Sequence, residues 1–138
     1  MDPVTAIGLA SGILTFIDFA HKIAIGADEL YQKATTDENM HTEKIVNDLD
    51  DAATDLASLP GRTKHEKALN RLSESCKEVS HELQQLLRRL TVSGKRTSWK
   101  ALKITVRNVR KESELAKLLA RLDKYRGELL LRLNLMLK

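Results

Sequence analysis

One cysteine, four histidines and one glycine–lysine pair are the candidates for a nucleophile, a metal site or a phosphate-binding loop. The histidines are scattered, and no two of them have the spacing that places metal ligands on one helix face. Cys76 and His81 are five residues apart, so on a helix they point to different faces and do not form a thiolate–imidazole pair. The four histidines are His21, His41, His65 and His81. We therefore expect neither a metal site nor an activated nucleophile.

Gly94 and Lys95 resemble the end of a phosphate-binding loop, but the residues around them do not fit one. Arg89 stands where the loop needs its first glycine, and Arg96 stands where it needs Ser or Thr to bind magnesium. The carboxylates of residues 48–55 are expected on an exposed helix face. Solvated surface carboxylates are therefore favoured over a carboxylate pair that acts in general acid–base catalysis. We therefore expect no enzymatic activity, no cofactor and no small-molecule substrate.

The composition of the chain predicts a helical protein. The 138 residues contain six glycines and two prolines, and only 4% are aromatic. Such a composition is typical of an all-α protein, and the length suits one domain, residues 1–138, with a core of its own. A single cysteine excludes an internal disulfide and favours a reducing compartment. Cys76 is expected to be a small residue of the core.

Apolar residues at three- and four-residue spacing predict four long helices and one short basic helix. Gly26 marks either a kink or a stopping point in the first helix, and Pro60-Gly61 supplies a turn. The expected helices span residue 3 to the low thirties, residues 37–58, 64–91 and 98–109, and residue 112 onward. Short loops between them favour an up-down bundle with one accessory helix. The apolar run before Lys138 lacks a capping signal, which indicates a domain cut from a longer polypeptide.

Residues 4–17 form an uncharged apolar run, and apolar residues resume after Asp18. A helix that is apolar all round is either the central element of a bundle or a segment that can meet lipid. Fourteen residues form a helix of about 21 Å, shorter than a bilayer core of about 30 Å. A longer span would contain Asp18, His21 and Lys22, although Asp18 and Lys22 can pair on one helix face. The run therefore predicts a conditional membrane helix rather than a constitutive one.

Charge is divided unequally along the chain. Residues 1–60 carry three basic and eleven acidic side chains, whereas residues 61–138 carry twenty basic and eight acidic ones. Within the second half, residues 88–111 hold nine basic side chains and no acidic one. This asymmetry indicates an anionic partner, an acidic–basic docking within the chain, or both, and a solvated basic surface is the plain alternative. Only Trp99 interleaves with these charges, so we expect no nucleic-acid binding.

Gly8 and Gly12 form a small-residue pair at four-residue spacing within the apolar run. Such a pair lets another helix approach closely in a membrane, and in a soluble bundle it can seat the helix against its neighbours. The pair therefore predicts close helix packing and leaves both settings open.

Several short motifs together cover essentially the whole chain. They are MDPVTAIGLA (1–10), FIDF (16–19), ELY (29–31), Leu72, CKEV (76–79), Leu83, Trp99-Lys100, and RLDKYR (121–126) with its leucine-rich tail. Their order and spacing are more specific than any one motif, and they resemble the N-terminal domain of fungal STAND receptors, which are NOD-like receptors. This domain is the HeLo-like family of cell-death-inducing domains.

The resemblance implies a cytoplasmic HeLo-like bundle that oligomerises, is recruited to the plasma membrane and permeabilises it in programmed cell death, within innate immunity and heterokaryon incompatibility. The partners would be anionic membrane lipids and further copies of the chain. The residues expected to insert are Val4, Ile7, Leu9, Ile13, Leu14, Phe16, Ile17 and Phe19. The expected headgroup contacts are Lys95, Arg96, Lys100, Lys103, Arg107, Arg110 and Lys111. Gly8 and Gly12 would allow close helix packing.

A soluble adaptor or homotypic interaction module is the alternative from a different class. Its first helix would remain in the core, and its acidic and basic halves would dock head to tail with another copy or with a partner. Strong vesicle binding would count against this alternative, and tight dimerisation without lipid affinity would favour it.

Overall fold

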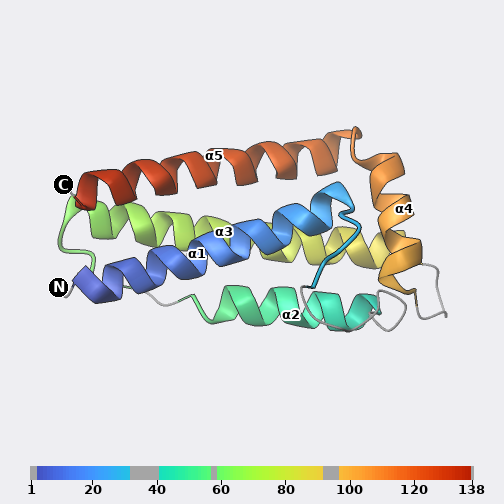
Figure 1. Cartoon of the computed structure of the whole chain (residues 1–138), viewed down its shortest axis with the longest axis horizontal. Coiled ribbons are helices and arrows are strands. Elements are labelled where there is room, and N and C mark those ends of the chain that lie inside the picture. Colours follow the sequence, from blue (N-terminus) through green and yellow to red (C-terminus); the bar gives the residue numbers. More distant parts are fainter. Residues whose placement is uncertain (1–2, 32–40, 57–58, 92–96, 138) are drawn as a thin grey trace.

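Four helices lie alongside one another in alternating directions, and a shorter helix crosses one end of them (Figure 1). The computed structural model describes residues 3–31, 41–56, 59–91 and 97–137, without the side chains of residues 3 and 4. The helices are α1 (Pro3–Ile25), α2 (Thr42–Thr54), α3 (Lys64–Leu90), α4 (Trp99–Val109) and α5 (Ser113–Met136). No strand occurs within these ranges. The prediction of an all-α up-down bundle with one accessory helix is confirmed.

α1 and α3 form the centre of the bundle, because each of them contacts the other four helices. The stripe predicted on α3 is buried from Leu69 to Leu87, and Cys76 lies within it. Burial raises the pKa of the Cys76 thiol to about 12, so this cysteine is the core residue that the sequence predicts. The largest fully buried side chains are Trp99, Phe16, Ile13, Ile17, Ile23, Ile45, Leu49, Leu69, Leu83, Leu87, Leu102 and Leu122.

Local side-chain caps explain where α3 and α4 begin. Before α3, the Thr63 hydroxyl accepts a hydrogen bond from the Glu66 backbone N–H (3.1 Å). The buried Glu66 carboxylate in turn accepts one from the Arg62 backbone N–H (3.2 Å). Before α4, the Ser98 hydroxyl accepts a hydrogen bond from the Ala101 backbone N–H (3.4 Å). These side-chain oxygens satisfy N–H groups that have no partner within their helix, so both helices begin within one residue of the expected position.

α1 ends before Gly26, so the expectation that it reaches the low thirties is wrong. Gly26 adopts φ +66°, and its N–H donates a hydrogen bond to the Ile23 carbonyl oxygen (3.1 Å). The next N–H, that of Ala27, donates to the Lys22 carbonyl oxygen (3.0 Å), which completes the left-handed turn that commonly closes helices at glycine. A Cβ at Gly26 would lie 2.7 Å from the Lys103 carbonyl oxygen, so the packing of α4 also requires glycine here.

α2 is shorter than the expected helix over residues 37–58. It begins at Thr42 and ends at Thr54, so Asp55 and Leu56 lie beyond it. Residues 37–40 and 57–58 of the expected helix lie outside the described residues.

Gly26→Ala should destabilise the bundle more than Gly61→Ala does. Both glycines have positive φ, a conformation that costs a residue with a Cβ about 1–2 kcal/mol. An added Cβ would have its nearest neighbour at 3.8 Å at Gly61 but at 2.7 Å at Gly26, so only Gly26→Ala adds a steric cost. Urea unfolding of the two variants measures the difference, and equal losses of unfolding free energy would contradict the close packing of α4 on α1.

Candidate functional site

α1 is the helix on which the predicted membrane role depends. Over Thr5–Ile25 its mean hydropathy is 1.3, and among the described residues it is the helix long and apolar enough to cross a bilayer. In the bundle, 44% of this candidate span is buried. Core helices of soluble bundles meet the same requirement, so the composition of α1 suits both a core and a bilayer.

The bundle covers most of the α1 face that the sequence predicts to insert into lipid. Four of these eight residues are buried in the core, and they are Leu9, Ile13, Phe16 and Ile17. Leu14 and Phe19 are half-buried against the core, and Ile7 is 40% exposed. The side chain of Val4 lies outside the described residues. This face can meet lipid only after α1 leaves its place in the bundle.

The two glycines of the predicted packing pair have different surroundings. A Cβ at Gly12 would lie 3.3 Å from Leu56 Cδ2, whereas a Cβ at Gly8 would have no atom of the described residues within 4 Å. A mostly apolar groove of about 250 Å³ between α1 and the end of α2 includes both glycines. Gly12 therefore lets the chain after α2 approach α1 within the bundle, while Gly8 faces the open groove.

α4 holds the C-terminal end of α1 through side chains on one face of its helix. Trp99 Nε1 donates a hydrogen bond to the Ala27 carbonyl oxygen (3.0 Å). Arg107 Nε donates one to the Gly26 carbonyl oxygen (2.6 Å), and the same guanidinium forms an ion pair with Asp28. Two carbonyl groups that follow α1 thereby obtain donors from α4, which joins the two helices.

Lys103 adds a second cation beside Asp28. Its Nζ lies 3.6 Å from Asp28 Oδ1, and its side chain is 15% exposed, compared with 83% for Asp28. The hydrogen bond and charge of Arg107, together with Lys103, hold the pKa of the Asp28 carboxyl below its ordinary value. Trp99, Lys103 and Arg107 stand four residues apart, so they share one face of α4. The set is named here the α1–α4 latch and consists of Gly26, Ala27, Asp28, Trp99, Lys103 and Arg107.

A further ion pair holds the C-terminal half of α1. Asp18 pairs with Arg126 of α5, and both side chains are about half exposed. The spacing in the sequence allows Asp18 to pair with Lys22 on the same helix, but the structure pairs this carboxylate with α5 instead. Asp18 and Asp28 come from the acidic half of the chain, and Arg126 and Arg107 come from the basic half. Acidic–basic docking within the chain, one of the alternatives that the charge asymmetry leaves open, therefore occurs at both points.

The expected headgroup contacts divide between the latch and the surface. Lys103 and Arg107 belong to the α1–α4 latch and act within the chain. Arg107 is nevertheless exposed, and the exposed members outside the latch are Lys100, Arg110 and Lys111. The members outside the described residues are Lys95 and Arg96. The latch was not predicted from the sequence, because four-residue spacing reveals that its α4 members share a face but does not identify the partner of that face.

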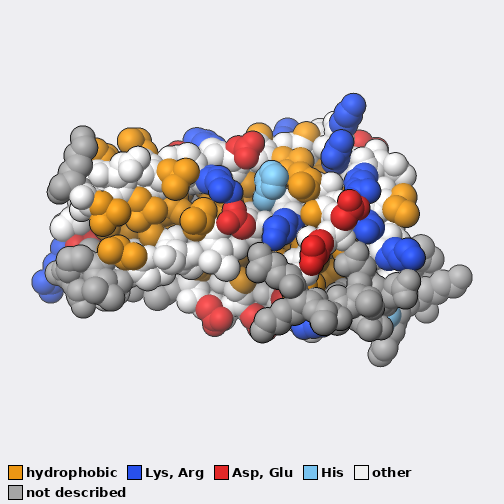
Figure 2. Space-filling view, in the orientation of Figure 1, with side chains coloured by type: hydrophobic (Ala, Val, Ile, Leu, Met, Phe, Trp, Pro, Cys, Tyr) orange, Lys and Arg blue, Asp and Glu red, His pale blue; other side chains and the backbone are white. Residues whose placement is uncertain are grey.

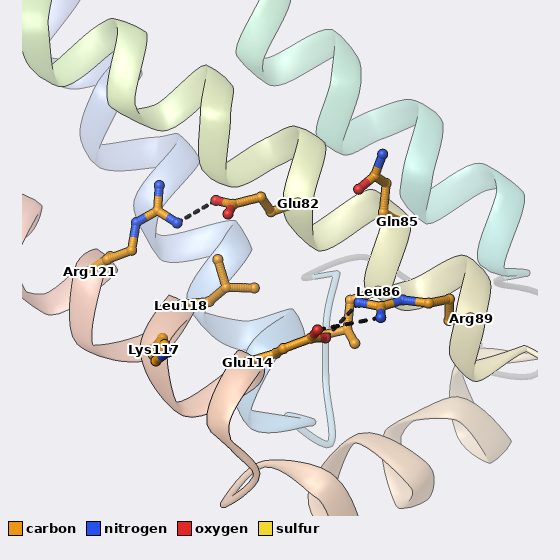
Figure 3. Close-up of a pocket in the computed structure, with 8 residues that line it drawn as sticks. All are labelled: Glu82, Gln85, Leu86, Arg89, Glu114, Lys117, Leu118 and Arg121. Carbon is orange, nitrogen blue, oxygen red and sulfur yellow. Dashed lines mark hydrogen bonds and ion pairs between the residues drawn. The ribbon is translucent and has the colours of Figure 1, made fainter.

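A groove of about 280 Å³ lies between α3 and α5 and is lined mainly by charged side chains (Figure 3). Arg121 of α5 forms an ion pair with Glu82 of α3. Nearer to α4, Arg89 Nη2 of α3 lies 2.6 Å from Glu114 Oε2 of α5. Because these pairs cross the groove at two points, most of its charges neutralise one another. The arrangement suits the joining of α3 to α5 better than the binding of a charged ligand.

No protein-family model, curated protein or solved structure matches the chain. Within the described ranges, no group of three or more His, Cys, Asp or Glu side chains is placed to hold a metal ion.

The ion pair of Asp28 should keep the latch closed at neutral pH. In acid the carboxylate becomes protonated, and the latch should weaken. Arg107 and Lys103 lower the pKa of the Asp28 carboxyl from its ordinary value of 3.8. The carboxylate therefore contributes fully to the stability of the fold at pH values above 3.8. The contribution is lost as the pH falls through the lower pKa of the folded state. The difference in unfolding free energy between the native chain and Asp28→Asn should stay constant from about pH 7 to about pH 5 and shrink below about pH 4.

Urea unfolding followed by tryptophan fluorescence measures this difference, since Trp99 is the only tryptophan and belongs to the latch. A difference that already shrinks near neutral pH would contradict the assigned ion pair.

Proposed function

We propose that this chain is a membrane-targeting cell-death execution domain of a fungal NOD-like receptor, a HeLo-like bundle that permeabilises the plasma membrane through α1. In this proposal the domain rests in the cytoplasm and is recruited to the plasma membrane on activation. The observation that carries the proposal is α1 itself, an apolar helix of spanning length whose later half and C-terminal end are held by polar contacts at the surface.

The apolar side chains of α1 can exchange one apolar environment for another. Removing an Ile, Leu or Phe side chain from water contributes about 1.5–3 kcal/mol. Lipid tails are as apolar as a leucine-rich core, so these side chains retain that contribution when α1 passes from the bundle into a bilayer. The balance between the two states therefore depends on polar contacts and charged residues.

The polar contacts of α1 favour the bundle. The α1–α4 latch and the Asp18–Arg126 ion pair are lost when the helix leaves. Asp18 and Lys22 would also cost about 2.5–3.5 kcal/mol each near the centre of a bilayer. Both lie in the second half of α1, so the uncharged residues 4–17 can enter lipid first. Opening the latch shifts the balance toward the membrane.

Departure of α1 would also change the contacts between copies of the chain. α3 and α5 both pack on α1, so their apolar faces would lose their cover. Another copy can cover them, which accounts for self-association on activation. Copies held at one membrane have a raised effective concentration for this association. Exposed basic residues such as Arg110 and Lys111 would attract anionic lipid headgroups.

A soluble homotypic interaction or adaptor module is the second candidate. The burial of Phe16 and Ile17 favours it, because a helix with this face in the core stabilises a soluble bundle. In this alternative α1 never leaves its place. The exposed carboxylates of α2, such as Asp50 and Asp51, would meet basic residues of another copy.

The native chain should release dye from anionic vesicles, and two carboxylates on the exposed face of α1 should suppress the release. Ser11 and Thr15 are exposed, so Ser11→Asp with Thr15→Asp leaves the core intact. Each carboxylate costs about 2.5–3.5 kcal/mol in a bilayer, so release should fall by about a hundredfold or more. Asn47→Asp with Asn108→Asp, at exposed positions of α2 and α4, is the matched control and should release dye like the native chain.

Arg107→Ala removes the latch bonds to Gly26 and Asp28 and should increase dye release by about tenfold, since a hydrogen bond contributes about 1 kcal/mol. The proposal is contradicted if neither the native chain nor Arg107→Ala releases dye, even when each is fused to an oligomerising coiled coil. Dimers in solution that dissociate when Asp50 and Asp51 are replaced by Asn would then favour the adaptor.

A further inference from the structure

Leucine side chains are exposed at the end of α5. Of the six large hydrophobic side chains exposed among the described residues, four lie here, with exposed fractions of 42–68%. They are named the terminal leucine face and are Leu130, Leu131, Leu135 and Leu137. α5 ends where α1 begins (Figure 1), and hydrophobic side chains gather at that end of the viewed surface (Figure 2). Exposed apolar patches of this kind mark contact surfaces on soluble domains.

Basic side chains lie beside the terminal leucine face. The end of α5 lies against the start of α3, because Arg132 Nη1 is 3.3 Å from His65 Nδ1. Glu66, the acidic residue in the first turn of α3, is buried and accepts a hydrogen bond from the Arg62 backbone N–H. The exposed cations here are named the α3 basic cluster and are Arg62, Lys64, Lys67 and Arg71. On this part of α5, Glu128 is exposed one turn before Arg132.

We propose that the terminal leucine face and the α3 basic cluster together dock the resting bundle on an anionic lipid bilayer while α1 remains in place. This inference rests on the membrane role proposed above and names the surface that makes the first contact. Leucine side chains enter the boundary between headgroups and acyl chains, and Lys and Arg side chains meet the anionic headgroups. Surfaces that combine these two features bind membranes reversibly without spanning them.

A second copy of the chain fits this surface less well than a bilayer does. Its acidic counterpart would be α2, where Glu43, Asp50 and Asp51 are exposed. The exposed large hydrophobic side chains of the described residues lie on α1, on α4 and at the end of α5, so α2 offers none of them to cover the leucines. An anionic bilayer supplies both the negative charge and the apolar interior that the surface requires.

Docking by this end would bring the start of α1 to the bilayer. Ile7, near that start, is 40% exposed, and the uncharged residues 4–17 precede Asp18. α4 lies at the opposite end of the bundle (Figure 1), so docking leaves the α1–α4 latch intact. Docking and the release of α1 are therefore separate steps, and different assays measure them.

Co-sedimentation of the full chain with phosphatidylcholine vesicles, with and without phosphatidylserine, tests the docking surface. Leu131→Ser should weaken binding to the vesicles that contain phosphatidylserine by about tenfold, and adding Leu135→Ser should weaken it further. Ile104→Ser is the matched control, because Ile104 on α4 and Leu131 are both 56% exposed. This control should leave binding unchanged.

Charge variants test the second component of the surface. Lys64→Gln with Arg71→Gln should weaken binding by about tenfold or more and reduce its dependence on salt. Arg88→Gln with Lys117→Gln removes the same charge from exposed residues near the end of α3 and the start of α5, and should change binding by less than about twofold. Lys64 and Arg71 lie toward the docking end, whereas Arg88 and Lys117 lie toward α4, so the comparison separates the two ends of the bundle.

Equal binding of Leu131→Ser and Ile104→Ser would overturn the inference, and so would a loss of binding confined to the Arg88 and Lys117 variant. Self-association without vesicles that Leu131→Ser abolishes would also overturn it, because the surface would then belong to a second copy. If the leucine variants bind and release dye like the native chain, the docking surface is wrong and the membrane role stands. A native chain that neither binds vesicles nor releases dye contradicts both proposals.

Discussion

The hydrogen bonds from α4 to the carbonyl groups that follow α1 are the contacts on which the arrangement of the bundle depends. Arg107 reaches the Gly26 carbonyl because glycine takes the left-handed conformation and leaves no Cβ between the two helices. The close contact between α4 and the end of α1 also buries Trp99. Trp99 donates a hydrogen bond to the Ala27 carbonyl oxygen and fills the core at the end that α4 covers. Since α1 also packs on α2, α3 and α5, a change at its C-terminal end affects every other helix.

The two ends of the bundle carry different features, and this separation organises the proposed function. One end holds the α1–α4 latch, where polar contacts keep an apolar helix in the bundle. The other end exposes the terminal leucine face beside the α3 basic cluster. Apolar side chains contribute nearly the same free energy in a core as in lipid, so they do not choose between the two states. Polar contacts and charges make that choice, and the latch and the docking surface lie at opposite ends of the bundle.

The hydrophobic pattern predicts most of the fold and little of the latch. A period of 3.6 residues places Cys76 and its neighbouring leucines on one face of α3, and that face is buried. The end of α1 could not be predicted in this way, because Gly26 is compatible with a kink or a stop, and the packing of α4 decides between them. Lys103 and Arg107 find partners more than 70 residues away, and local spacing reveals a shared helix face without identifying what it contacts.

The proposed function requires α1 to leave the bundle and enter lipid, and a fluorophore on the exposed face of α1 reports this movement. Ser11→Cys supplies one reactive thiol, because burial of Cys76 raises its pKa to about 12 and keeps it unreactive. With anionic vesicles, an environment-sensitive dye at position 11 should shift its emission to the blue and be quenched by nitroxides on lipid acyl chains. A dye that remains in water and is quenched by aqueous iodide, while the protein stays bound to the vesicles, would contradict the account.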